Sequence, residues 1–161
     1  MVKSSTSKIR PLVLAAIIAA IYVALVFALA PFSFGAIQVR VADALVGIVP
    51  LVGMPGVIGI TIGVFIGNIP SPLGPLDLLS TVPTFIALLI TLKLRNFSVM
   101  AGLLAYSIIV SLWVGLILSY AFSLPFVMTF IYLLIGIGFA TAGLGYLLYK
   151  AMKSMIGKRL E

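Results

Sequence analysis

The sequence FGAIQVRVADAL at residues 34–45 contains an arginine and an aspartate within a chain that is otherwise almost free of charges at membrane depth. A glycine-rich apolar run follows, and the chain then reads NIPSPLGPLD at residues 68–77, which ends in a second aspartate. Ionisable groups inside a membrane cost roughly a few kcal/mol each and usually serve a function. We therefore interpret residues 34–77 as one wall of a small-molecule site.

The composition of the whole chain is that of a polytopic membrane protein. Its 161 residues are 63% hydrophobic and 8% charged, and no soluble domain of this size could cover so much apolar surface with so few charges. The apolar runs are long and lack the alternation of membrane strands, which predicts helices. We expect an all-α integral membrane protein with a single membrane domain over residues 1–161.

Six membrane spans are predicted, over residues 11–30, 36–52, 56–69, 76–92, 97–119 and 124–149. The apolar run from 36 to 68 is too long for one helix, and the sequence VGMPG at 52–56 breaks it. Basic residues cluster near the N-terminus, at residues 93–95 and in the tail, so an even number of spans separates these clusters if all are cytoplasmic. The break supplies that parity. We expect both termini in the cytoplasm, with nine of the ten cations on that side and Arg40 as the exception.

The first apolar segment has one alternative interpretation, a cleaved signal peptide that ends at Ala28-Leu29-Ala30. The segment is too long for a typical signal-peptide core, and Pro31 after the cut would obstruct cleavage. We expect the segment to be retained as the first span.

The predicted topology gathers the remaining polar residues near the outer ends of their spans. These candidate binding residues are Gln38, Arg40, Asp43, Asn68, Asp77 and Trp113. Each has a structural alternative: an ion pair along one helix face, a helix cap, or a place in the interfacial aromatic belt. Together they form a net negative patch of donors and acceptors, which suits a cationic or donor-rich heterocycle with an aromatic ring available for stacking.

Small residues recur at a spacing of four on two of the spans. They are Ala15, Ala16, Ala19, Ala20 and Ala24 in the first span, and Gly59, Gly63 and Gly67 in the third. Such faces let helices approach closely in lipid. Helix propensity alone is the alternative for the alanines, and packing within the bundle is favoured for the glycines.

Other chemistries are excluded by what the sequence lacks. With no cysteine and no histidine, the chain has no thiolate or imidazole metal site and no nucleophile–histidine pair, so we expect no metal, no cofactor and no enzyme activity. The net charge of +7 reflects topology signals at span ends rather than nucleic-acid binding. No phosphate-binding loop of the GxxxxGK type is present, so active transport would require a partner that hydrolyses ATP.

The quoted residues resemble a signature of the queuosine-precursor transporter family (QueT type). In that family a Gly-x-Ile-Gln-Phe-Arg-Val-Ser-Glu-Ala-Leu run follows the first span, and residues 35–45 match it except for Val39 in place of Phe, Ala42 in place of Ser and Asp43 in place of Glu. The likeness continues in the glycine-rich run that ends at Asn68 and in LDLLST at residues 76–81. It covers roughly residues 10–95, and the last third mainly by hydropathy. Where the family tends to carry Asn or Glu, the last two spans offer Ser107, Ser111, Trp113 and Thr141.

Proteins of this family look like substrate-binding S components of energy-coupling factor (ECF) transporters. The resemblance implies a six-helix S-component fold in a prokaryotic cytoplasmic membrane and a pocket open to the outside. It implies a transmembrane coupling subunit, packed on the alanine face of the first helix, and two cytoplasmic ATPases as partners. The implied cargo is a queuosine precursor, a 7-deazaguanine with an aminomethyl cation. Asp43 and Asp77 are then the candidates for its guanine-type edge and its ammonium, in either order.

Three alternatives to this function stay open. The nearest is the same architecture with another cargo, such as a pyrimidine, thiamin or another purine. A stand-alone channel or carrier is less favoured, because the inner half of every predicted span lacks a polar path. A structural or assembly protein of the membrane would tolerate neutralisation of Asp43 and Asp77 without loss of any ligand response.

Overall fold

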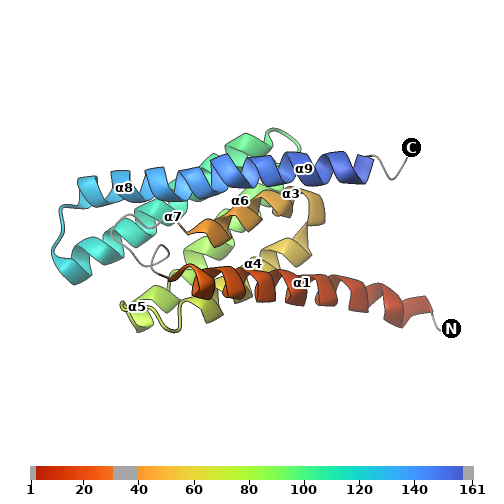
Figure 1. Cartoon of the computed structure of the whole chain (residues 1–161), viewed down its shortest axis with the longest axis horizontal. Helices are drawn as coiled ribbons and strands as arrows, with labels where there is room; N and C mark the ends of the chain where they lie inside the picture. Colours follow the sequence, from red (N-terminus) through yellow and green to blue (C-terminus); the bar gives the residue numbers. More distant parts are fainter. Residues whose placement is uncertain (1–2, 31–39, 158–161) are drawn as a thin grey trace.

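The computed structural model describes residues 3–30 and 40–157, and every regular element in these ranges is helical. Gln38, one of the candidate binding residues, lies outside the described residues. The elements are α1 (Lys3–Ala28), η1 (Val41–Ile48), α3 (Val49–Val52), α4 (Met54–Gly67), α5 (Pro75–Leu78), α6 (Thr81–Leu94), α7 (Val99–Phe122), α8 (Phe126–Gly138), η2 (Phe139–Gly145) and α9 (Tyr146–Gly157). They form one bundle, shown in Figure 1.

Four helical segments in the described part of the chain are long and apolar enough to cross a membrane. They are Ile9–Ala28, Pro75–Leu94, Val99–Phe122 and Phe126–Ile156. Their outward faces carry large apolar side chains such as Leu12, Val82 and Val127, as expected of surfaces that face lipid. The protein is therefore a multi-pass helical membrane protein.

Two further apolar segments, Val41–Val52 and Met54–Gly67, are shorter. With a rise of about 2.0 Å per residue in a 3₁₀-helix and 1.5 Å in an α-helix, each reaches about 21–22 Å, less than the roughly 30 Å of a hydrocarbon core. They meet at Gly53, whose φ of 74° is a left-handed conformation that glycine adopts without strain. This turn reverses the chain at the position of the expected break, and the pair forms a short V in the bundle wall rather than two full-length spans.

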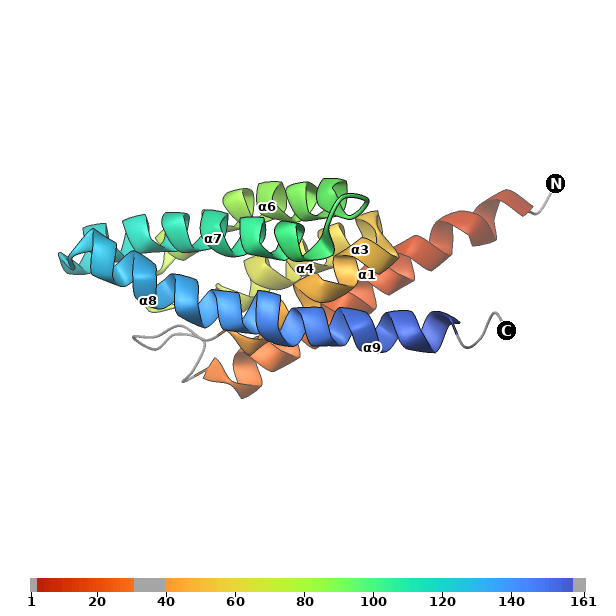
Figure 2. The same ribbon diagram turned by 90° about the horizontal axis from the view of Figure 1, so that it is seen from above.

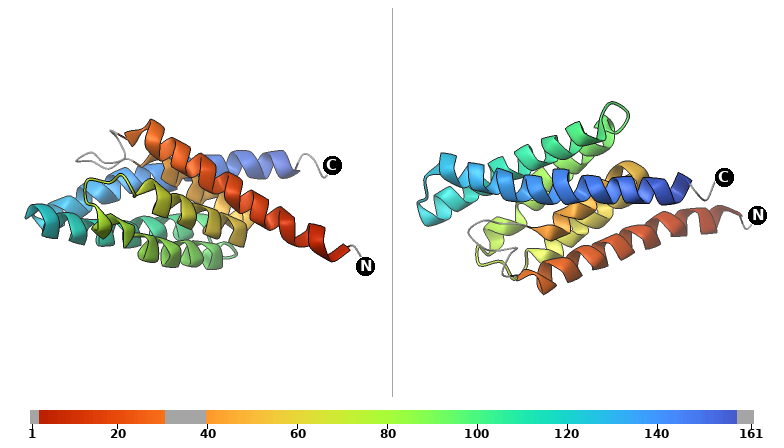
Figure 3. Two further views of the ribbon diagram at one scale, coloured as in Figure 1. Left: turned by 90° about the horizontal axis from the view of Figure 1, so that it is seen from below. Right: turned by 45° about the horizontal axis from the view of Figure 1, so that its top comes forward.

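One end of the bundle collects the basic residues. The start of α1 and the end of α9 lie at the same end in both views of Figure 3. The Gly53 turn lies there too, beside the α6–α7 connection. A Cβ built on Gly53 would come within 3.9 Å of a guanidinium nitrogen of Arg95 in that connection. Lys93, Lys150 and Lys153 are in the helices that reach this end. We call it the basic end. In Figure 1, α5 and the α7–α8 connection lie at the opposite end.

The glycine face of α4 packs directly on α1. A Cβ at Gly59 would lie 2.6 Å from the carbonyl oxygen of Ala15, and one at Gly63 would lie 2.8 Å from the Cβ of Tyr22. The side chains that face the three glycines of this stripe, in order, are Ile18, Tyr22 and Val26. Both series have a spacing of four, so one ridge of side chains on α1 fits a glycine groove on α4. The packing predicted for these glycines is what the structure contains.

The segments η1 and η2 are not α-helical, and they pack against each other. The eight residues of η1 form a 3₁₀-helix and the seven of η2 a π-helix, both unusual at these lengths. At their contact, a Cβ on Gly47 would lie 1.9 Å from the carbonyl oxygen of Gly145. The π-helix also carries Thr141, whose hydroxyl lies 2.5 Å from that of Ser107 on α7. Figure 2 shows α8, η2 and α9 following one another as a single long rod.

Candidate functional site

Asp43 is surrounded by groups from three elements. It lies in the first turn of η1 and is 2% exposed. The hydroxyl of Tyr22, on α1, donates a hydrogen bond to its Oδ1, and its carboxylate also interacts with Arg40 and with Tyr106 of α7. Two phenols and a guanidinium therefore surround one carboxylate. This is how a buried charge is normally satisfied.

Asp77 lies in the first turn of α5 and forms an ion pair with Arg40. The guanidinium Nη2 is 3.9 Å from Oδ2 of Asp77, and the two side chains are 9% and 2% exposed. Arg40 precedes the first residue of η1, so the ion pair connects η1 to α5. The same arginine interacts with both aspartates, which makes it the shared countercharge of the cluster.

Further hydrogen bonds link Asp77 to α7 and to the end of α4. The Ser80 hydroxyl donates to Oδ1 of Asp77 at 3.2 Å, and the indole Nε1 of Trp113 donates to the Ser80 oxygen at 3.2 Å. The side-chain amide of Asn68 donates to the Asp77 backbone carbonyl at 3.0 Å. This network fixes the position of Asp77 from three sides. We call the set Tyr22, Arg40, Asp43, Asn68, Asp77, Ser80, Tyr106 and Trp113 the polar cluster.

Two acceptor atoms in the polar cluster have no hydrogen-bond donor among the described residues. They are Oδ1 of Asn68 and Oδ2 of Asp77, and both are buried. A buried acceptor without a donor costs about 1–3 kcal/mol, and more when the group is charged. When both aspartates are ionised, the cluster carries two negative charges and one positive charge. The arrangement therefore has spare acceptor capacity and a net negative charge, which are the properties of a site for a ligand with N–H donors.

The sequence located part of this cluster. Five of the candidate binding residues lie in one network: Arg40, Asp43, Asn68, Asp77 and Trp113. Their use in binding stays a prediction. Tyr22, Ser80 and Tyr106 were not among the candidate binding residues. A signal existed for both tyrosines, because a phenol inside an apolar span needs a hydrogen-bond partner. Tyr120, near the outer end of the predicted span over residues 97–119, is 84% exposed and does not belong to this buried cluster.

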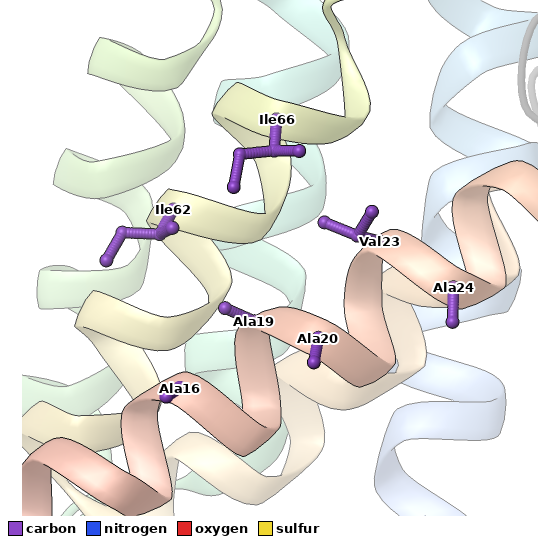
Figure 4. Close-up of a pocket in the computed structure, with 7 residues that line it drawn as sticks. All are labelled: Ala16, Ala19, Ala20, Val23, Ala24, Ile62 and Ile66. Atoms are coloured by element: carbon purple, nitrogen blue, oxygen red, sulfur yellow. The ribbon is translucent and has the colours of Figure 1, made fainter.

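The alanine face of α1 divides into two parts. Ala15 and Ala19 are buried, and Ala15 is covered by the glycine face of α4, so these two have little surface left for a partner, and the assignment of the five alanines to a partner interface stays a prediction. The other three are exposed. With Ala19 and three larger side chains they line an open apolar groove between α1 and α4, drawn in Figure 4: Ala16, Ala19, Ala20, Val23, Ala24, Ile62 and Ile66. We call this the alanine groove.

Comparison with known proteins identifies the family. The model of a family described as QueT transporter matches residues 12–154. Neither the curated proteins nor the solved structures contain a match. Because the family match covers most of the chain, the protein belongs to the QueT transporter family, which confirms the resemblance drawn from residues 35–81.

Proposed function

We propose that this member of the QueT transporter family is the substrate-binding S component of an ECF-type importer, and that it captures aminomethyl-deazaguanine from outside the cell. The observation that carries the proposal is the polar cluster: eight polar or aromatic residues in or next to helices of the bundle meet in a chain that is otherwise apolar. Structural stability does not require this arrangement, because buried ion pairs can be replaced by apolar side chains at little cost.

The chemistry of the cargo fits the cluster. A 7-deazaguanine presents adjacent N–H donors on its pyrimidinone edge, and the unsatisfied oxygens of Asn68 and Asp77 are acceptors. Its aminomethyl group is a cation, which suits the net negative charge left by two aspartates and one arginine. Trp113, whose indole is bonded to Ser80, offers an aromatic face near the same place. An enzyme role is not supported, since the family is one of transporters.

The proposed orientation puts the basic end in the cytoplasm of a prokaryotic cell, following the positive-inside rule. The V formed by Val41–Val52 and Met54–Gly67 then completes a six-segment topology, with both termini inside and the polar cluster toward the outside. The S-component role implies two kinds of partner. One is a transmembrane coupling subunit, and the other is a pair of cytoplasmic ATPases. We assign the coupling subunit to the alanine groove, where three exposed alanines leave room for the backbone of another helix.

Uptake measurements on the groove test this proposal. In cells that express the protein together with an ECF coupling module, we expect ATP-dependent accumulation of labelled aminomethyl-deazaguanine. Ala20→Phe should reduce accumulation and co-purification of the coupling subunit about tenfold or more, because a bulky ring fills the groove. Cargo binding by the purified variant should be unchanged. The control is Ala121→Phe, at an exposed alanine of α7, which should behave as wild type.

The outcomes separate the candidate functions. Accumulation that needs no coupling module would favour a stand-alone carrier and contradict the S-component role. Accumulation of thiamin or another nucleobase in place of the deazaguanine would keep that role and replace the cargo. Normal co-purification of Ala20→Phe with the coupling subunit would remove the assignment of the groove.

A further inference from the structure

The two aspartates of the polar cluster have different surroundings, and the difference lies in their free oxygens. Asp43 accepts a hydrogen bond from Tyr22 at Oδ1 and interacts with Tyr106 and Arg40. Asp77 uses Oδ1 to accept from Ser80, while its Oδ2 has no hydrogen-bond donor among the described residues and faces the guanidinium of Arg40 at 3.9 Å. That distance is beyond hydrogen-bond range. The carboxylate of Asp43 therefore has three protein partners, whereas Asp77 has an oxygen without a donor in the described part of the chain.

Asn68 adds a second available acceptor beside Asp77. Its amide nitrogen donates to the Asp77 carbonyl at 3.0 Å, which fixes the side chain and leaves Oδ1 as the free atom. Asn68 is fully buried and Asp77 is 2% exposed. Buried polar atoms in folded proteins nearly always have partners, and exceptions indicate an absent ligand or a functional role. Two such atoms on two residues joined by a hydrogen bond fit a ligand edge with two adjacent N–H donors.

From these contacts we infer that Asp77 and Asn68 form the acceptor pair that reads the donor edge of the ligand, and that Asp43 is a positioning residue. Asp43 connects η1 to α1 and α7 through the two tyrosines and helps to hold Arg40, which in turn faces Asp77. The ligand class is a heterocycle with an amino group next to a ring N–H, the pattern of a 2-aminopyrimidinone. The inference rests on the proposed function and assigns separate roles to two residues that the sequence could not distinguish.

The test is a cycle between protein variants and a matched pair of ligands. The ligands are aminomethyl-deazaguanine and the same compound without its 2-amino group, and equilibrium binding is measured for both. Wild type should bind the complete ligand roughly 10- to 100-fold more tightly than the truncated one, since the missing group leaves an acceptor unpaired. Asp77→Asn and Asn68→Leu should each reduce that ratio to about threefold or less. Asp43→Asn and Tyr22→Phe should weaken binding of both ligands and leave the ratio unchanged.

Asn68→Leu keeps the test decisive if Asp77→Asn does not fold, because it removes an unsatisfied acceptor without removing a charge. A wild-type ratio of affinities near one would overturn the inference while leaving the proposed cargo in place. The same holds if the ratio is unchanged in Asn68→Leu and also in Asp77→Asn, where that variant folds. A ratio that collapses in Asp43→Asn would also overturn it, because the two aspartates would then have exchanged roles. If wild type bound neither ligand, the proposed cargo itself would fail, and this assignment with it.

Discussion

Replacing Arg40 by methionine is expected to destabilise the folded protein by about 3–5 kcal/mol, the usual cost of removing one partner from a buried ion pair. Arg40 interacts with both Asp43 and Asp77, and all three side chains are buried. Without the guanidinium, two carboxylates would lie in a region of low dielectric with no countercharge. We expect a large fall in melting temperature in detergent micelles, together with loss of cargo binding.

The control for this prediction is Arg10→Met, at an exposed position on α1, which should leave the melting temperature almost unchanged. A second variant tests the mechanism. Combining Arg40→Met with Asp77→Asn removes one of the two carboxylate charges, so the double variant should recover part of the lost stability. If Arg40→Met melted at the wild-type temperature, the shared-countercharge description of the cluster would be wrong.

A second large effect is expected at the contact of η1 with η2. Gly47→Ala would place a methyl carbon 1.9 Å from the carbonyl oxygen of Gly145, which is backbone and cannot move aside as a side chain can. Overpacking typically costs about 1–3 kcal/mol, and this contact should reach the upper end of that range or exceed it. We expect little folded protein from Gly47→Val and a strongly lowered melting temperature for Gly47→Ala.

Gly138→Ala is the matched control. Gly138 is helical with φ of −61°, and a Cβ there meets nothing within 4 Å. The substitution should be neutral or stabilising by up to about 1 kcal/mol, since alanine has the higher helix propensity. Equal melting temperatures for Gly47→Ala and Gly138→Ala would mean that η1 and η2 do not approach as closely as described. Because η1 carries Asp43, that result would also weaken the geometry of the polar cluster.

The hydropathy and glycine patterns predicted the helical bundle, because hydropathy depends on the local sequence and a glycine stripe lies along one face of a single helix. A long apolar run must be helical in lipid, and a glycine stripe such as that of α4 must lie against a neighbour. The break at Gly53 was also visible, because a glycine followed two residues later by Pro55 is a local signal. The prediction that Arg40, Asp43 and Asp77 lie near one another came from the predicted topology alone. Topology sets the depth of a residue in the membrane but does not set its contacts.

The features that sequence reasoning missed depend on contacts between distant segments. A 3₁₀-helix at Val41–Ile48 and a π-helix at Phe139–Gly145 are set by how these segments pack, not by their own propensities. The division of the alanine face follows from which side of α1 meets α4. Likewise, the different surroundings of Asp43 and Asp77 depend on Tyr22 and Tyr106, which are far from both in sequence.

The central claim is that the polar cluster binds a deazaguanine cargo, and the most direct test is ligand-dependent thermal stability of the purified protein. A ligand that binds only the folded state raises the melting temperature with the logarithm of its concentration over its Kd. The compounds to compare are aminomethyl-deazaguanine, its nitrile relative, guanine, queuine and thiamin, each with wild type and with Asp77→Asn. We expect a selective, concentration-dependent rise in melting temperature with the deazaguanines that is lost in Asp77→Asn. A well-folded wild type that responds to none of these compounds, or a rise that Asp77→Asn retains in full, would contradict the central claim.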